Sequence, residues 1–124
     1  MPVVTAPSSP THDLGSTRFT SLASPTRGSR ETSLWHAEID AGTEPTPHSL
    51  SREEVFVVLS GTASVRIDGV EETATSGDAI IVPPGVMFEL RNGGPEPLRL
   101  LCCMPVGGQA SMPDGVPFTP PWAQ

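Results

Sequence analysis

The sequence contains no lysine and no tyrosine, and these absences restrict the chemistry open to the protein. All seven basic side chains are arginine. Without lysine, Schiff-base catalysis and lysine-based binding of nucleotide phosphates are excluded. Without tyrosine, no phenolic hydroxyl can act as a general acid or base. Arginine as the sole basic residue, together with many alanines, glycines and prolines, is typical of a GC-rich bacterial genome.

Cysteine is scarce, and long hydrophobic runs are missing. The two cysteines, Cys102 and Cys103, are neighbours in the sequence, a spacing that rarely reaches disulfide geometry. We therefore expect a reduced, cytoplasmic protein rather than a disulfide-stapled secreted one. The first residues have neither the basic nor the apolar region of a signal peptide. No apolar run is long enough to span a bilayer, so no membrane association is expected.

Positive charge is also in short supply, since 14 acidic residues against 7 basic ones give a formal net charge of −7. This balance argues against nucleic acid and anionic membranes as partners. Glycine and proline are abundant, with 12 and 15 residues, and no window shows a sustained helical period of apolar residues. Such a composition favours many short strands joined by tight turns.

Short alternating or apolar segments bounded by turn residues predict an all-β domain. Strands are expected over residues 18–22, 33–40, 54–59, 62–67, from 70 onward, and over 78–82, 86–91 and 98–104. Six or more short strands at this spacing indicate a sandwich or a small barrel. Residues 1–16 are predicted to form a flexible N-terminal arm, and residues 17–124 the barrel domain. The Pro-rich C-terminal tail holds Phe118 and Trp122 and is expected to pack on the body.

Two glycine-framed spacings stand out in the central part of the chain. Gly42 is followed by five residues and His48, and then by Glu54 and Gly61. Further on, Gly77 is followed by five residues and the turn 83–85, and Asn92 closes the second frame. The pattern resembles the two motifs of the cupin family. This resemblance implies a single small β-barrel of the double-stranded β-helix or jelly-roll type.

The resemblance also implies a metal site, but this chain departs from the family at half of the ligand positions. The family holds a divalent metal through three histidines and one glutamate inside the barrel. In this chain Leu50 and Phe88 stand at two of the histidine positions, so only His48 and Glu54 carry over. Catalytic metal centres normally have three protein ligands. Cys102 is a candidate third ligand, and the alternative is a thiol that acts as a small buried apolar group.

His48 and Glu54 are therefore the candidate catalytic residues, expected to converge in an apolar interior, and the alternative is a hydrogen-bonded pair without a function. Apolar surroundings raise the proton affinity of a carboxylate. Three functions remain open. The first is a metal-independent isomerase, cyclase or lyase in which Glu54 is the general base and His48 orients it or acts as acid. The second is a metal-dependent oxygenase or isomerase with a reduced ligand set. The third is a non-catalytic module that binds a small molecule.

The expected substrate pocket is apolar, with one sulfur-containing strand on its wall. Its candidate residues are Trp35, Leu50, Phe56, Phe88, Cys102 and Met104. The segment Val55–Leu59 is apolar on the side away from Glu54 as well, which indicates that both faces of this strand are covered. We therefore expect a homodimer. The cofactor is left open between none and a divalent transition metal.

Overall fold

The computed structural model describes residues 2–124 and shows an all-β molecule with two short 3-10 helices, η1 (Pro25–Arg27) and η2 (Pro121–Ala123). The strands are β1 (His12–Asp13), β2 (Thr17–Ala23), β3 (Thr32–Ile39), β4 (Ser49–Leu50), β5 (Glu54–Ser60), β6 (Ala63–Ile67), β7 (Val70–Ala74), β8 (Ala79–Val82), β9 (Phe88–Asn92), β10 (Leu98–Pro105) and β11 (Ala110–Ser111). The predicted all-β fold is confirmed. Within residues 2–124, no helix has the length and apolar character needed to cross a membrane.

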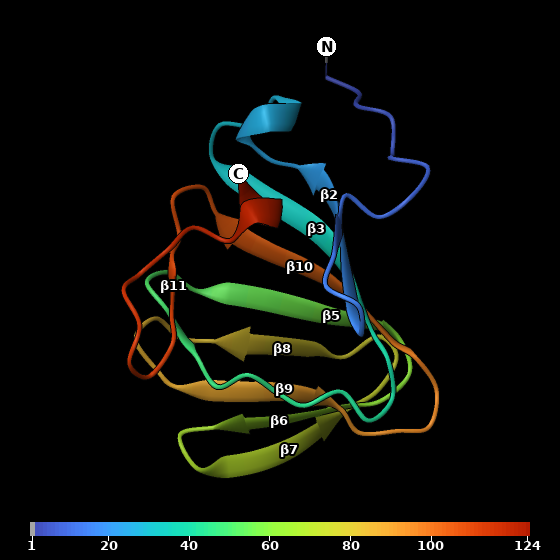
Figure 1. The fold of residues 1–124 in the computed structure, drawn as a ribbon, viewed down its shortest axis with the longest axis vertical. Coiled ribbons are helices and arrows are strands. Elements are labelled where there is room, and N and C mark those ends of the chain that lie inside the picture. The colour runs from blue at the N-terminus through green and yellow to red at the C-terminus, as the bar shows by residue number, and fades with distance from the viewer. Residues whose placement is uncertain (1) are drawn as a thin grey trace.

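The strands form two main layers. The larger is a six-stranded sheet in the order β1-β2-β3-β10-β5-β8, and the smaller is a three-stranded sheet in the order β7-β6-β9 (Figure 1). The short pair β11-β4 is a third, two-stranded sheet. Strands far apart in sequence pair in the centre of the large sheet, where β10 lies between β3 and β5. Such non-local pairing, with one core between facing sheets, is the jelly-roll arrangement that the resemblance implied.

Side chains alternate strictly along the central strands and so define an inner and an outer face. On β10, Leu98, Leu100, Cys102 and Met104 are buried, whereas the residues between them are half-buried or exposed. On β5, Glu54, Phe56 and Val58 point inward. The core between the layers is built from such inward positions of both sheets. Because Glu54 is in phase with Phe56 and Val58, the strand carries its carboxyl group into an apolar interior.

Tight turns join the strands where glycine allows them. Asp68 and Gly69, with φ of 51° and 80°, connect β6 and β7 in a two-residue hairpin, between the strands predicted over 62–67 and from 70 onward. Gly61 has a φ of 86°, and a side-chain carbon there would lie 2.6 Å from the carbonyl oxygen of Pro97. Only glycine fits this close approach of two backbones.

The two ends of the chain meet on the large sheet. His12 and Asp13, at the end of the predicted flexible arm, pair with Phe19 and Arg18 of β2. The C-terminal segment lies against β2 and β3, where the Ser33 hydroxyl donates a 2.8 Å hydrogen bond to the carbonyl of Ala123. The N-terminal segment therefore extends the edge of the large sheet, and the C-terminal segment packs on β2 and β3.

Candidate functional site

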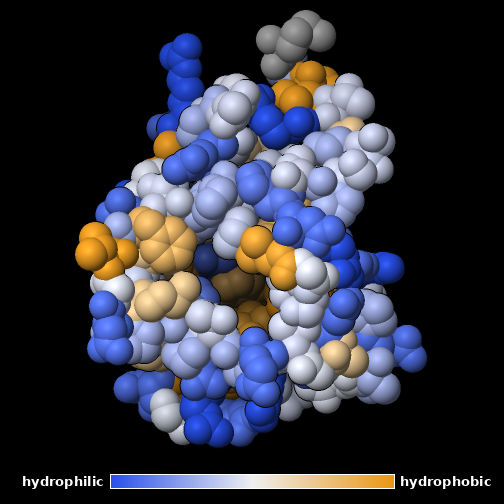
Figure 2. Space-filling model, viewed as in Figure 1, coloured by the Kyte–Doolittle hydropathy of each residue, from blue (hydrophilic) through white to orange (hydrophobic). Residues whose placement is uncertain are grey.

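A cavity of about 260 Å³ lies between the layers. Figure 2 shows its mouth as a hollow in the middle of one face of the molecule, with apolar side chains within it and at its rim. Its wall is mostly apolar, and its few polar groups include Glu54, His48 and three threonines. Cavities for small ligands typically have volumes of about 300–1,000 Å³, so this one fits a small molecule.

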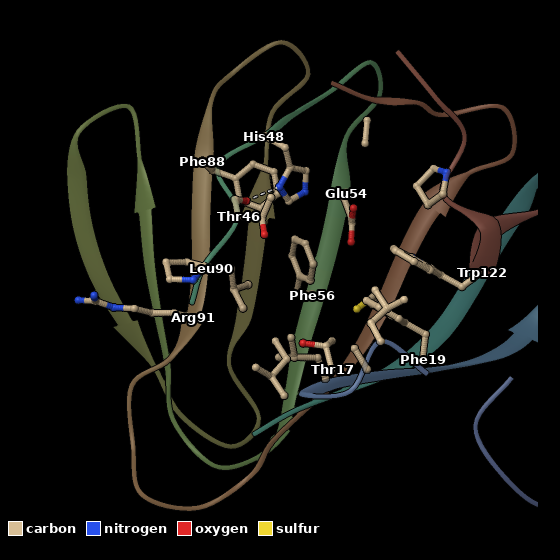
Figure 3. Close-up of a pocket in the computed structure, with 18 of the residues that line it drawn as sticks. Thr17, Phe19, Thr46, His48, Glu54, Phe56, Phe88, Leu90, Arg91 and Trp122 are labelled. Atoms are coloured by element: carbon tan, nitrogen blue, oxygen red, sulfur yellow. Dashed lines mark hydrogen bonds between the residues drawn. The ribbon is translucent and has the colours of Figure 1, made fainter. Parts of the chain in front are cut away.

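Glu54 presents an unpaired carboxyl group to this cavity (Figure 3). Its residue surface is 4% exposed, and no group among residues 2–124 forms a hydrogen bond with the carboxyl oxygens. Burial raises the pKa of Glu54 to about 8, because an apolar environment disfavours the charged form. At neutral pH this side chain is therefore mainly a neutral carboxylic acid.

His48 reaches the cavity from the side of the smaller sheet. Its backbone exchanges two hydrogen bonds with Phe88 of β9, and its ring lies 4.4 Å from the Phe88 ring, centroid to centroid. The Nδ1 atom lies 2.8 Å from the carbonyl oxygen of Thr46 (Figure 3). A carbonyl only accepts, so Nδ1 carries the hydrogen and Nε2 is the free acceptor of the neutral ring. Burial lowers the pKa of His48, which keeps the ring neutral at neutral pH.

The structure brings Glu54 and His48 to one cavity but does not join them. Glu54 belongs to the six-stranded sheet and His48 to the segment bridged to β9. In the described chain no hydrogen bond or ion pair links the two side chains, so the hydrogen-bonded pair of the non-functional alternative is not formed. The Thr46 carbonyl accepts from Nδ1 of His48, and Nε2 has no partner among residues 2–124. Both side chains line the same cavity.

The residues predicted to form the pocket are mostly found on its wall. Trp35, Leu50, Phe56, Phe88 and Cys102 all line the cavity. Met104 does not, although it is on the same face of β10 as Cys102. It is 1% exposed and packs against Gly108, outside the lining residues.

Sequence reasoning missed the part of the wall that comes from outside the glycine-framed motifs. Phe19 of β2 and Trp122 of η2 stack with ring centroids 3.7 Å apart and planes 3° from parallel. Both line the cavity, and so does Phe118. The aromatic residues of the tail were predicted to pack on the body, but nothing in their local sequence connects them with His48 and Glu54.

The donor set does not fit the metal site of the family. Leu50 and Phe88, at two of the family's ligand positions, are 3% and 2% exposed and offer no donor atom. Over residues 2–124, no three His, Cys, Asp or Glu side chains are grouped so as to hold a metal ion. Cys102 lines the cavity, and burial raises the pKa of its thiol well above its usual value, as expected for a buried apolar thiol.

Comparison with protein families identifies the central part of the chain. A family model described as a cupin domain matches residues 35–104, which is more than half of the chain. An uncharacterised protein of Methanocaldococcus jannaschii is 31% identical over 72 residues, which are 57% of this chain and 58% of that protein. The chain thus spans little more than half the length of this relative.

Solved structures give the same fold. A putative ethanolamine utilization protein from Salmonella typhimurium is 27% identical with a TM-score of 0.60, covering 71% of this chain and 68% of that one. An RmlC-like cupin from Shewanella frigidimarina is 26% identical with a TM-score of 0.65, covering 75% and 79%. A salicylate 1,2-dioxygenase from Pseudoaminobacter salicylatoxidans shares the fold alone, at 18% identity and a TM-score of 0.70, covering 85% and 31%.

Proposed function

The chain belongs to the cupin family, and from this premise we propose that it binds a small molecule in its cavity. In this proposal Glu54 and His48 transfer protons to and from the bound molecule, without the metal ion that the family binds. The observation that carries the proposal is the Glu54 carboxyl, buried at the cavity wall without a protein partner. A buried polar group that no protein group satisfies is unfavourable unless something else binds it. A ligand oxygen or nitrogen would satisfy it.

The protonation states support a division of roles. With a pKa of about 8, Glu54 is the proton donor at neutral pH. His48, neutral and protonated at Nδ1, has its Nε2 lone pair available as the proton acceptor. These roles are the reverse of those expected from the sequence, where Glu54 was the base. The difference arises because Glu54 is buried without the partner that would lower its pKa.

This pair suits a proton shift next to a carbonyl group. The Glu54 carboxyl donates its proton to the carbonyl oxygen while Nε2 of His48 removes a proton from the neighbouring carbon. The product is the enol, with Glu54 as carboxylate and His48 as imidazolium. Return of the protons to different atoms completes an isomerisation, and loss of a leaving group from the enol gives an elimination. General acid–base catalysis of this kind contributes about 10²- to 10⁴-fold to a rate.

Deuterium exchange into a simple ketone tests the proposal without knowledge of the natural substrate. The wild-type protein in D2O is expected to accelerate deuterium incorporation next to the carbonyl of cyclohexanone, followed by NMR. The variants Glu54→Gln and His48→Gln should each lose this acceleration by roughly 100-fold. The matched control is Glu53→Gln, which makes the same substitution at an exposed neighbouring position.

The other two candidate functions predict different results. Equal exchange in wild type and Glu54→Gln, with ligand binding retained, would make the protein a binding module. A metal content near one equivalent after incubation with iron, zinc, manganese and nickel, together with metal-dependent exchange, would support the metal-dependent alternative instead.

We also propose that a second copy of the chain covers the outer face of the six-stranded sheet. This face presents a continuous apolar area formed by Leu34, Val55, Val57, Leu59, Ile81, Leu101 and Cys103. Ile81 and Leu59 are 58% and 46% exposed in the single chain. At one border, Glu38 binds both Arg18 and Arg99, so both signs of charge are present. A two-fold axis can therefore pair the face with its own copy.

Analytical ultracentrifugation tests the dimer. Wild type is expected to sediment as a dimer and Ile81→Lys as a monomer. Val70→Lys is the control, because Val70 is 63% exposed on the smaller sheet and should leave the dimer intact. A monomeric wild-type protein at micromolar concentration would contradict this proposal.

A further inference from the structure

All six phenylalanine and tryptophan side chains line the same cavity. The chain has four phenylalanines, two tryptophans and no tyrosine. The six are Phe19, Trp35, Phe56, Phe88, Phe118 and Trp122, and each contributes to the wall around Glu54 and His48. Core packing elsewhere in the described chain is done by aliphatic residues, alanine and methionine. The aromatic rings of the described chain are therefore concentrated at one site.

The aromatic wall has two origins in the chain. Trp35, Phe56 and Phe88 lie within the residues matched by the family model, and they are 2%, 7% and 2% exposed. The other three rings come from the segments before and after the matched residues. The stacked pair of Phe19 and Trp122 faces the cavity from the side opposite Phe88 in Figure 3. The residues matched by the family model therefore contribute three of the aromatic rings around the cavity, and the flanking segments contribute the other three.

The charges on the wall limit the kind of ligand. Arg91 is the one lining residue among residues 2–124 with a permanent positive charge. Its guanidinium points away from the cavity in Figure 3 and donates a 2.9 Å hydrogen bond to Glu71. Glu44 is exposed at the mouth. No cation is therefore available inside to pair with an anionic ligand, and burying an unpaired charge is unfavourable.

We infer that the ligand of this site is an uncharged aromatic or conjugated planar molecule that carries a hydrogen-bonding oxygen. The inference deepens the proposed function, because the oxygen is the atom that Glu54 contacts. Aromatic rings pack favourably against ligand rings in stacked or edge-to-face geometry. The cavity of about 260 Å³ limits the molecule to a small size. The three rings from the flanking segments then determine which member of this class of ligand is bound; they are Phe19, Phe118 and Trp122.

A cationic ligand is the principal competitor for this kind of wall. Aromatic boxes also bind quaternary ammonium groups through the faces of the rings. Binding of a cation requires Glu54 to ionise inside the apolar cavity, so that its carboxylate balances the positive charge of the ligand. The uncharged ligand needs no such change, because a neutral carboxylic acid donates directly to a carbonyl oxygen.

Three probes with one ring system separate these possibilities by isothermal titration calorimetry at pH 7. They are 2-acetylnaphthalene, the anion 2-naphthoate and the cation 2-naphthyltrimethylammonium. The uncharged ketone is expected to bind at least tenfold more tightly than either charged probe. Tighter binding of either charged probe, or no binding of the ketone at millimolar concentration, would overturn the inference.

Two variants test the role of the flanking rings. Trp122→Leu and Phe118→Leu should each weaken ketone binding about 2- to 10-fold, the contribution of one aromatic pair. Phe118 is 38% exposed, so its variant stays informative if Trp122→Leu fails to fold. Val116→Ala, at a position 84% exposed, is the control and should bind like wild type. Unchanged affinity in both ring variants would refute the assignment of these rings to specificity.

The two proposals fail in distinguishable ways. If 2-acetylnaphthalene binds in the expected order but deuterium exchange into cyclohexanone does not depend on Glu54, the proton-transfer function fails and the ligand class stands. If exchange depends on Glu54 but the aromatic ketone does not bind, the ligand class fails and the function stands.

Discussion

Replacement of Glu54 by glutamine is expected to change how the stability of the protein depends on pH. The pKa of Glu54 is raised from an ordinary value of 4.5 to about 8 in the folded protein. Between these two values the folded state binds one more proton than the unfolded state. The free energy of unfolding of the wild type must therefore fall as pH rises through this window and level off above pH 8. Glutamine has no such proton, so the variant lacks this contribution.

The size of the effect follows from the shift itself. One pKa unit corresponds to about 1.4 kcal/mol, so Glu54 makes the wild type about 3 to 4 kcal/mol less stable at pH 8 than at pH 5. His48 and His36 have lowered pKa values and act in the opposite sense, with their effect complete near pH 6.5. The histidines are the same in both proteins, so their contribution cancels in the difference between wild type and variant.

Urea unfolding at pH 5, 6, 7 and 8 measures this difference. We expect Glu54→Gln to gain stability relative to wild type as pH rises, by about 3 to 4 kcal/mol across the range. Glu53→Gln, the exposed neighbour, should follow the wild type at every pH. The reasoning is refuted if the difference in unfolding free energy between wild type and Glu54→Gln changes by less than about 1 kcal/mol from pH 5 to pH 8, since the carboxyl would then have no raised pKa.

Three further outcomes follow from the structure. Gly61→Ala should destabilise the fold by at least about 2 kcal/mol in thermal unfolding, whereas Gly69→Ala, with nothing within 4 Å of the added carbon, should cost about 1 kcal/mol. Equal losses of stability in the two variants would show that the close approach of the Pro97 backbone does not restrict the side chain at position 61. Asn92→Ala should cost about 2–3 kcal/mol, because Asn92 bonds to two carbonyls and one N–H group. Dialysis against EDTA should leave the midpoint of thermal unfolding unchanged, and a fall of several degrees would indicate a bound structural metal.

The sequence predicted the strands well where side-chain alternation was strong. On β10 the alternate residues from Leu98 to Met104 are apolar and buried. On β3 Trp35 and Ala37 are buried and Ile39 is half-buried. The two-residue strands β4 and β11 were not predicted, because a pair of residues carries no periodic signal. Pairing of His12–Asp13 with β2 was missed for the same reason, in a segment whose composition favours disorder.

The candidate site was predicted less completely, since it depends on contacts between distant residues. The inward orientation of Glu54 follows from its phase with Phe56. The hydrogen bond from His48 to Thr46 depends on the course of an irregular segment, which no periodic pattern reports. The stacking of Phe19 on Trp122 joins positions at opposite ends of the chain. No local pattern in the sequence reports such a contact.

The placement of the tryptophans makes the protein its own optical probe. With no tyrosine present and both indoles on the cavity wall, near-ultraviolet absorption and emission arise almost wholly at that wall. Entry of a molecule, or displacement of the C-terminal segment, will change the emission spectrum. Fraying of the β6–β7 hairpin, which has no aromatic residue, will leave the spectrum unaltered. Intrinsic fluorescence therefore separates events at the cavity from local unfolding elsewhere.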